Sequence, residues 1–352
     1  MQLDFTAVLI IPTGIGAEVG GYAGDALPIA RCLAGAVDCL ITHPNVLNGA
    51  NLYWSLPNTL YVEGYALDRF LAGEWNLQPV HSNSIGVILD CDIPDDLKLR
   101  HRQVIGAVRA TLGLRVLDPL LTEVGLGVEL RLAESGVSWG TIAQVDELRR
   151  CGAKLKQAGA TAIAVVAWFP NHFYGEYSAQ VEKYRQGQGV DILAGVEAVI
   201  SHLLTRELMI PCAHAPALQP LPLNPAVDDR ACAEELGFTF LPCVLVGLSR
   251  APQIVTQGGI DRSQVKAVIV PESACGGSGL LAIAHQPHVQ IIAVKNLTVL
   301  SVYPEQVGIK PEQVIRVNNY AEAIGVITAL KTGVGWRSLY PAAHSPPPPP
   351  HR

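Results

Sequence analysis

A cysteine in a glycine-rich turn is the first residue of this sequence that could do chemistry. The stretch PESACGGSG, residues 271–279, follows the apolar run Val268–Val270 and precedes a stretch with helical spacing. Ligands of open α/β sheets bind beyond the carboxyl ends of strands, and the free N–H groups of a following helix favour anions. The same field lowers the pKa of a thiol, so Cys275 is a candidate nucleophile. A tight turn with small packed side chains is the alternative. Contacts to an anionic substrate are predicted for Ser273, Gly276, Gly277 and Ser278.

The stretch IPCAHAP, residues 210–216, is a second candidate. Cys212 and His214 are two residues apart on an extended segment, so their side chains point the same way. They are candidate catalytic residues, as a thiolate–imidazole couple or, with a third ligand, as part of a metal site. Because no acidic or histidine cluster accompanies them, no metal is predicted. A buried cysteine beside a histidine bonded to backbone is the structural alternative.

Uncharged polar side chains follow the second predicted strand in THPNVLNGAN, residues 42–51. His43 is a candidate catalytic residue, and Asn45 and Asn48 could orient amide, carboxylate or hydroxyl groups of a substrate. Asparagine also stabilises turns, which is the alternative. Lys295 follows the run Val289–Val294 and would neutralise an anionic ligand if that strand lies beside the one before Cys275.

The first predicted strand runs into the glycine-rich turn 13–24. Gly14 and Gly16 are candidate anion-binding positions, but the third small residue of a dinucleotide fingerprint is replaced by Val19, so dinucleotide redox chemistry is disfavoured. No phosphate-binding G-x-x-x-x-G-K-[ST] motif is present. The sequence requires no cofactor, and the identity of any cofactor stays unknown.

Two further polar clusters have weaker signals. The acidic turn 90–96 could hold Mg²⁺, but it is more typical of a solvated helix N-terminus. In the predicted helix 191–205, Glu197 and Ser201 are four residues apart and share a face, whereas His202 lies on a different one.

Alternating strand and helix patterns predict an α/β protein with mostly parallel open sheets, helices on both faces, and two lobes with a cleft between them. Strands are expected at 238–247 and 265–270, among others. The predicted divisions are an N-terminal lobe (1–214), a proline-rich crossover (215–236), a C-terminal Rossmann-like lobe (237–335) and a disordered proline-rich tail (336–352).

Composition narrows the classes of partner. The formal net charge is −6 and no lysine or arginine run is present, which disfavours nucleic acid binding. Apolar stretches are strand-sized, so no membrane association is expected. The N-terminus resembles a strand more than a signal peptide, and the eight cysteines are dispersed, which predicts a cytoplasmic protein. Homo-oligomerisation is left open.

Four stretches together resemble an uncharacterised family of cyanobacteria and plant plastids, domain of unknown function 3326. They are THPNVLNGA (42–50), GVEAVISHL (195–203), IPCAHAP (210–216) and PESACGGSG (271–279). The resemblance spans nearly the whole chain apart from the proline tail. It implies a cyanobacterial cytoplasm as the setting and transfers no activity or catalytic residue.

The preferred hypothesis is an enzyme of small-molecule metabolism with a site between the lobes. It would act on an anionic substrate by cofactor-independent acid–base or thiol-assisted chemistry, as an isomerase, racemase or hydrolase. A transferase that holds a phosphorylated substrate in the glycine-rich loops is one alternative. A non-enzymatic ligand sensor or assembly factor is the other.

Overall fold

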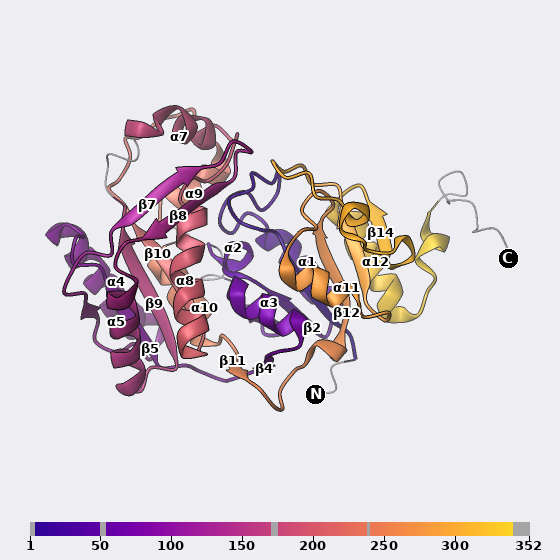
Figure 1. Ribbon diagram of the computed structural model, residues 1–352, viewed down its shortest axis with the longest axis horizontal. Coiled ribbons are helices and arrows are strands. Elements are labelled where there is room, and N and C mark those ends of the chain that lie inside the picture. Colours follow the sequence, from indigo (N-terminus) through magenta and orange to yellow (C-terminus); the bar gives the residue numbers. More distant parts are fainter. Residues whose placement is uncertain (1–3, 50–53, 170–174, 238–239, 341–352) are drawn as a thin grey trace.

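The computed structural model describes residues 4–49, 54–169, 175–237 and 240–340. Two parallel sheets organise this part of the chain, as predicted (Figure 1). The larger sheet has the order β14-β13-β12-β1-β2-β3, and all its neighbouring strands are parallel. Its strands are β1 (Thr6–Leu9), β2 (Cys39–Thr42), β3 (Thr59–Tyr61), β12 (Val265–Pro271), β13 (Gln290–Val294) and β14 (Val314–Val317).

The second sheet has the order β10-β9-β5-β6 and is also parallel. Its strands are β5 (Ile85–Leu89), β6 (Leu120–Leu121), β9 (Ala162–Trp168) and β10 (Cys212–Ala217). The central strands of both sheets are continuous apolar runs, as expected for strands that are covered on both faces.

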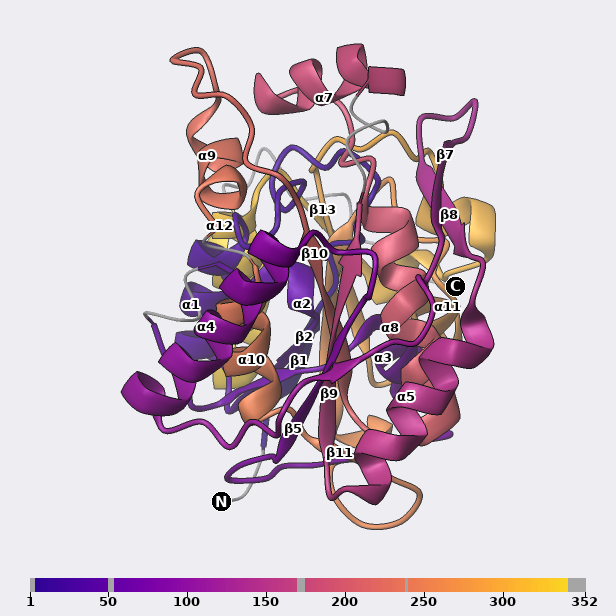
Figure 2. The same ribbon diagram turned by 90° about the vertical axis from the view of Figure 1, so that its left-hand side faces the viewer.

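Helices cover both faces of each sheet. On the larger sheet, α1 (Leu27–Ala36) and α12 (Tyr320–Thr332) share one face, and α3 (Gly64–Ala72) and α11 (Ser278–Ala284) cover the other. On the smaller sheet, α4 (Asp95–Leu112) and α10 (Leu241–Ser249) cover one face, and α5 (Val145–Gln157) and α8 (Ala194–Leu208) cover the other. Figure 2 shows these last four helices around β5, β9 and β10. We call each sheet with its helices the first and the second lobe.

Smaller elements complete the second lobe and the junction. The antiparallel hairpin of β7 (Val128–Leu132) and β8 (Ser138–Ile142) packs on α8, and α7 (Ser178–Arg185) contacts α9 (Asp229–Glu235). The chain passes between the lobes at β4 (Asn76–Gln78) and β11 (Gln253–Val255), which pair antiparallel (Figure 1). In the first lobe a short helix, α2 (Pro44–Leu47), follows β2. Short 3-10 turns lie at Arg262–Gln264, Pro304–Val307, Pro311–Gln313 and Trp336–Leu339.

The predicted lobe boundaries do not follow the sheets. Because β12 pairs with β1, the first and last parts of the chain form one lobe, and the second lobe is inserted between β4 and β11. The predicted crossover 215–236 contains the end of β10 and the whole of α9. Local patterns predict strands but not their partners across such a sequence distance.

Two local predictions are also corrected. The predicted strand 238–247 is helical from Leu241, with Pro242 in its first turn; residues 238–239 lie outside the described residues. A short apolar run that is buried between two layers has no periodicity that separates helix from strand. The predicted tail begins too early, because Trp336 packs on the core and residues 336–339 form a 3-10 turn. Residues 341–352 lie outside the described residues.

Candidate functional site

A cavity of about 460 Å³ lies between the two lobes. The first lobe contributes loops at the carboxyl ends of β1, β2 and β3, and the second contributes α4, α7, α8, α9, the end of β10 and the start of α10. This volume suits a small-molecule ligand, and the edge beyond parallel strands is where α/β folds bind ligands. Apolar side chains form much of the wall: Leu97, Leu193, Leu218, Leu221, Phe240 and Leu241.

Polar residues predicted after β2 line the first-lobe side of the cavity. His43 is buried, and its Nε2 accepts the N–H of Ile11 at 3.0 Å, so the neutral ring has its proton on Nδ1. Burial lowers the pKa of His43 to about 4, which keeps it uncharged at neutral pH. Asn45 donates to the carbonyl of Gly20, and Asn48 accepts the hydroxyl of Tyr61 at 3.0 Å. These residues therefore form a neutral polar wall.

His214 lies on the opposite lobe between a hydroxyl group and a carboxylate. Its Nδ1 is 3.2 Å from Ser201 Oγ, and its Nε2 is 3.6 Å from Glu197 Oε2. Glu197 and Ser201 share a face of α8, as their spacing predicts, and that face points to β10. The other oxygen of Glu197, Oε1, is buried and has no hydrogen-bond partner among the described residues. Such an oxygen lacks the hydrogen bond that buried acceptors ordinarily have.

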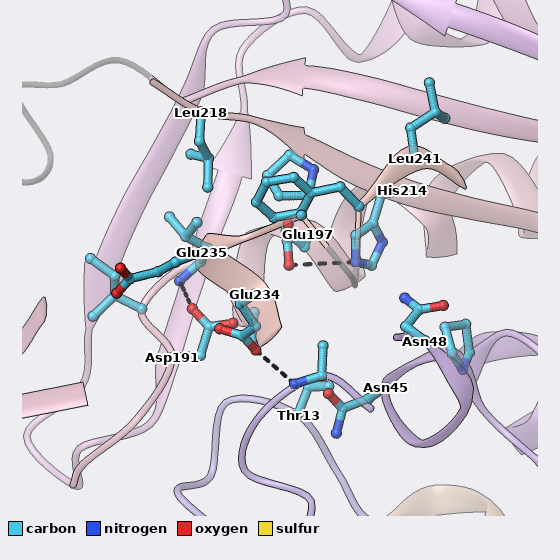
Figure 3. A pocket seen from close by; sticks show the side chains of 18 of the residues that line it. Thr13, Asn45, Asn48, Asp191, Glu197, His214, Leu218, Glu234, Glu235 and Leu241 are labelled. Atoms are coloured by element: carbon cyan, nitrogen blue, oxygen red, sulfur yellow. Dashed lines mark hydrogen bonds and ion pairs between the residues drawn. The ribbon is translucent and has the colours of Figure 1, made fainter. Parts of the chain in front are cut away.

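Two more carboxylates line the cavity, and Figure 3 shows Asp191 and Glu234 together below Glu197. Burial raises the pKa of Asp191 to about 7, with repulsion from Glu197 adding to the effect. Burial, and then the charge of Asp191, also raises the pKa of Glu234 well above its ordinary value. Glu234 accepts the hydroxyl of Tyr184 and, at 2.7 Å, the N–H of Ala23 from the first lobe. The cavity thus gathers three carboxyl groups, two of which keep their protons to a higher pH than usual.

A second contact between the lobes borders the same cavity. Glu63 caps the N-terminus of α3 by accepting the N–H groups of Tyr65 and Ala66, and its Oε1 is 3.0 Å from His202 Nε2 on α8. Burial alone lowers the pKa of His202, but the hydrogen bond and charge of Glu63 outweigh it and the net shift is upward. When His202 is protonated, this contact is an ion pair that links the two lobes.

Arginines do not neutralise this charge. Arg185 is paired with Glu235 at 2.7 Å and with Glu182 at 3.3 Å, and Arg100 is exposed. Within the described ranges, the carboxylates of Asp191, Glu197 and Glu234 form no ion pair with a lysine or arginine. The site is acidic, which does not favour the anionic substrate expected from the glycine-rich loops.

The Cys275 loop is not among the residues that line the cavity. Cys275 is fully buried in the core between α3, α11 and the larger sheet, and burial raises the pKa of its thiol to about 12. Ser273 pairs with Thr298 at 3.0 Å. Gly276 and Gly277 are exposed, and the segment at Val302 pairs with the loop through the N–H of Cys275 at 2.8 Å.

The start of α11 has its own carboxylate in place of a bound anion. Asp68 of α3 accepts the Ser278 hydroxyl at 2.6 Å and the Gly279 N–H at 3.1 Å. This carboxylate already accepts two of the donors that were expected to bind a phosphate or carboxylate ligand, the Ser278 hydroxyl and the Gly279 N–H. Lys295 is exposed, and it too is absent from the cavity lining.

The turn after β1 packs against protein on both sides. A Cβ added to Gly14 would lie 2.6 Å from Ser138 Oγ, and one added to Gly16 would lie 2.7 Å from the Gly189 carbonyl oxygen. The N–H of Val299 donates to Ile15 at 2.7 Å, so segment 296–302 fills the crevice beside both glycine-rich loops. The glycines permit close packing of segments here.

The remaining predicted residues also have structural partners. Cys212 is buried, its Sγ lies 3.4 Å from the carbonyl oxygen of Ile210, and burial raises the pKa of its thiol. Among the described residues, Asp90, Cys91 and Asp92 form the one group close enough to hold a metal ion. Asp90, however, accepts three backbone N–H groups, from Asp92, Leu126 and Trp168. That carboxylate therefore organises the loops around β5.

A family model described as "Protein of unknown function (DUF3326)" matches residues 6–340. The chain belongs to this family. It is 53% identical, over 97% of its length and 94% of the relative's, to a Synechococcus protein named an uncharacterized lipoprotein. A solved periplasmic binding protein/LacI regulator from Alkaliphilus metalliredigens, complexed with D-xylulofuranose, is similar at 8% identity and a TM-score of 0.18, covering 72% of this chain and 92% of that one.

The relative's name corrects one prediction. A cytoplasmic location was expected from the N-terminus and the dispersed cysteines, but a protein 53% identical to this one is named a lipoprotein, so that expectation is wrong. In the part of the chain that the structure describes, no helix is both long and apolar enough to cross a membrane.

Part of this cavity was predictable from the sequence, and its acidic part was not. His43, Asn45, Asn48 and His214 line it as expected of a cleft between lobes. Of the carboxylates, Glu197 carried one signal, the face it shares with Ser201. Glu234 carried none, because a glutamate in a short helix is typical of a solvated surface. Whether any of the predicted residues act in catalysis or binding stays a prediction.

Proposed function

We propose that this protein binds a small molecule in the interlobe cavity and that the ligand carries a positively charged nitrogen. The observation that supports this most is the set of three carboxylates, Asp191, Glu197 and Glu234, that face one cavity without a lysine or arginine partner among the described residues. An ammonium group relieves their mutual repulsion and supplies donors for the free Glu197 Oε1. The leucine-rich wall contacts the carbon skeleton.

A set of matched four-carbon probes tests the charge preference directly. Putrescine, 1,4-butanediol and succinate have similar lengths but carry two positive charges, none and two negative charges. We expect putrescine to raise the thermal midpoint at pH 8, 1,4-butanediol to have little effect and succinate to have none. The gain with putrescine should disappear in Glu234→Gln and persist in Asp118→Asn, which changes an exposed carboxylate outside the cavity. Equal or stronger binding of succinate would refute the proposal.

Acid–base catalysis at this site is the second candidate, and the arrangement of Ser201, His214 and Glu197 favours it. His214 can hold a proton on Nε2 toward Glu197 while Nδ1 accepts the Ser201 hydroxyl, so it could transfer a proton to or from a bound ligand. Thiol assistance has no comparable support, because burial raises the pKa values of Cys275 and Cys212. A transferase that uses the glycine-rich loops also lacks support, because the carboxylate of Asp68 already occupies the start of α11.

Turnover separates an enzyme from a ligand sensor. A ligand found by thermal shift is incubated with the protein in D₂O and followed by proton NMR. Loss or exchange of ligand signals that depends on His214 would indicate acid–base catalysis, with His214→Gln as the variant and the exposed His288→Gln, outside both cavities, as a control. Unchanged signals with wild-type protein would favour the sensor.

A further inference from the structure

A second cavity, of about 640 Å³, opens at the lobe junction and has the opposite charge. It is lined by the start of β3 and the preceding loop in the first lobe, and by the end of α4, the segment before β5 and the end of α10 in the second. We call it the basic groove. The residues that line it are Leu47, Ser55, Leu56, Thr59, Tyr61, His81, Ser82, Asn83, Leu112, Gly113, Leu114, Arg115, Val246, Gly247, Ser249 and Arg250.

The charges of the basic groove are of one sign. Arg115, Arg250 and His81 line it, and none of its described lining residues is an aspartate or glutamate. Arg250 donates to Ser55 Oγ at 2.8 Å, a bond that crosses from the second lobe to the first. Neither arginine forms an ion pair with a carboxylate in the described part of the chain. In a chain with a formal net charge of −6, an unneutralised basic concavity is a local exception.

Hydroxyl groups add neutral donors to these charges. Ser55 and Ser82 are exposed at the groove, and Thr59 Oγ1 is buried beside it without a hydrogen-bond partner in the described residues. Guanidinium groups bind phosphate and carboxylate through paired N–H donors, and hydroxyl groups complete such sites. The combination is suited to an anion that bears several oxygens.

The groove also connects to the acidic cavity through one buried contact. Tyr61 lines the groove, and its hydroxyl donates at 3.0 Å to Asn48, which lines the acidic cavity. Gly247 of α10 lies against the Tyr61 ring, because a Cβ there would be 2.4 Å from it. A molecule bound in the groove would therefore contact both lobes close to the wall of the other site.

We propose that the basic groove is a second ligand site, which binds a small polyanion bearing phosphate or carboxylate groups through Arg115 and Arg250. It is separate from the proposed amine site in position and in charge. The anion recognition that was expected at the glycine-rich loops is thereby assigned to the lobe junction, where neither arginine forms an ion pair among the described residues.

Binding of pyrophosphate and citrate, measured by isothermal titration calorimetry at low ionic strength, tests this site. We expect saturable 1:1 binding of at least one of them, weakened tenfold or more by Arg115→Gln or Arg250→Gln and unchanged by Arg102→Gln, which alters an exposed arginine of α4 outside the groove. Preference between the two probes distinguishes a phosphate ligand from a carboxylate ligand. Binding that is absent, or equal in all three variants, would overturn the proposal.

Comparing one variant of each cavity distinguishes binding at the basic groove from binding at the proposed amine site. Glu234→Gln should abolish putrescine binding and leave anion binding unchanged, whereas Arg115→Gln should do the reverse. Circular dichroism of each variant checks that it is folded. Loss of both ligands in one folded variant would show that the two cavities are not independent sites and would contradict the assignment.

Discussion

Replacing Asp191 by asparagine should stabilise the protein at alkaline pH, because the wild-type carboxylate is buried among like charges. Its pKa is raised from 3.8 to about 7 by burial and by Glu197. In the unfolded chain the carboxyl group titrates near its ordinary value, so stability falls as the pH rises from about 4 to about 7. Above pH 7 the cost is roughly 4 kcal/mol, at about 1.4 kcal/mol for each pH unit of the shift.

Asparagine keeps the oxygen that accepts the Leu193 N–H at 2.9 Å. It also buries an amide N–H₂ group, which costs about 1–2 kcal/mol if unpaired. The net gain for Asp191→Asn is then about 2–3 kcal/mol at pH 8. At pH 5 the folded wild type is protonated and its remaining cost is about equal to that of the amide, so the net change is close to zero.

Calorimetric melting at the two pH values measures this difference. For a chain of 352 residues the gain corresponds to a rise in Tm of about 3–4 °C at pH 8. Asp118→Asn, at an exposed carboxylate, is the control and should shift Tm equally at both pH values. The same shift at pH 5 and pH 8 for Asp191→Asn, or a loss of stability at pH 8, would refute the reasoning. If the stabilised variant also loses putrescine binding, the destabilising charge belongs to the site.

Three further predictions concern neighbouring features. In native protein, iodoacetamide should label the exposed Cys32 and spare Cys275, as mass spectrometry of peptides would show; labelling of Cys275 before unfolding would contradict its burial. Asp68→Ala removes the acceptor at the start of α11 and should cost about 1 kcal/mol in urea unfolding, and an unchanged midpoint would argue against the capping role. Glu63 raises the pKa of His202, so this pair stabilises the fold fully below pH 6.5 and less as the pH rises through the raised pKa. His202→Gln should therefore lower Tm more at pH 6 than at pH 8.5. An equal loss of Tm at the two pH values would show that the charge of His202 does not contribute to stability.

The fold class and the polar residues that follow some of the strands could be predicted from local patterns in the sequence. Continuous apolar runs with several β-branched residues, such as Ala162–Trp168, favour a parallel strand covered on both faces, and strands of this kind alternating with helices indicate an α/β architecture. His43 could be placed near a cleft because it directly follows β2, and chains leave the sheet at the ends of such strands, whereas His214 lies within β10. Glu197 and Ser201 share a face because helical spacing is local.

Local patterns did not reveal which strands pair and which loops stay open, because both depend on contacts between distant segments. The pairing of β1 with β12 joins segments from the two ends of the chain, and no local pattern encodes it. The glycine-rich loops were predicted to bind an anion through their unpaired N–H groups. In the folded chain, Asp68 of α3 and segment 296–302 accept several of those N–H groups. The acidic cavity and the basic groove likewise collect residues from both lobes. The charge of each site depends on residues from distant segments of the chain, which only folding brings together.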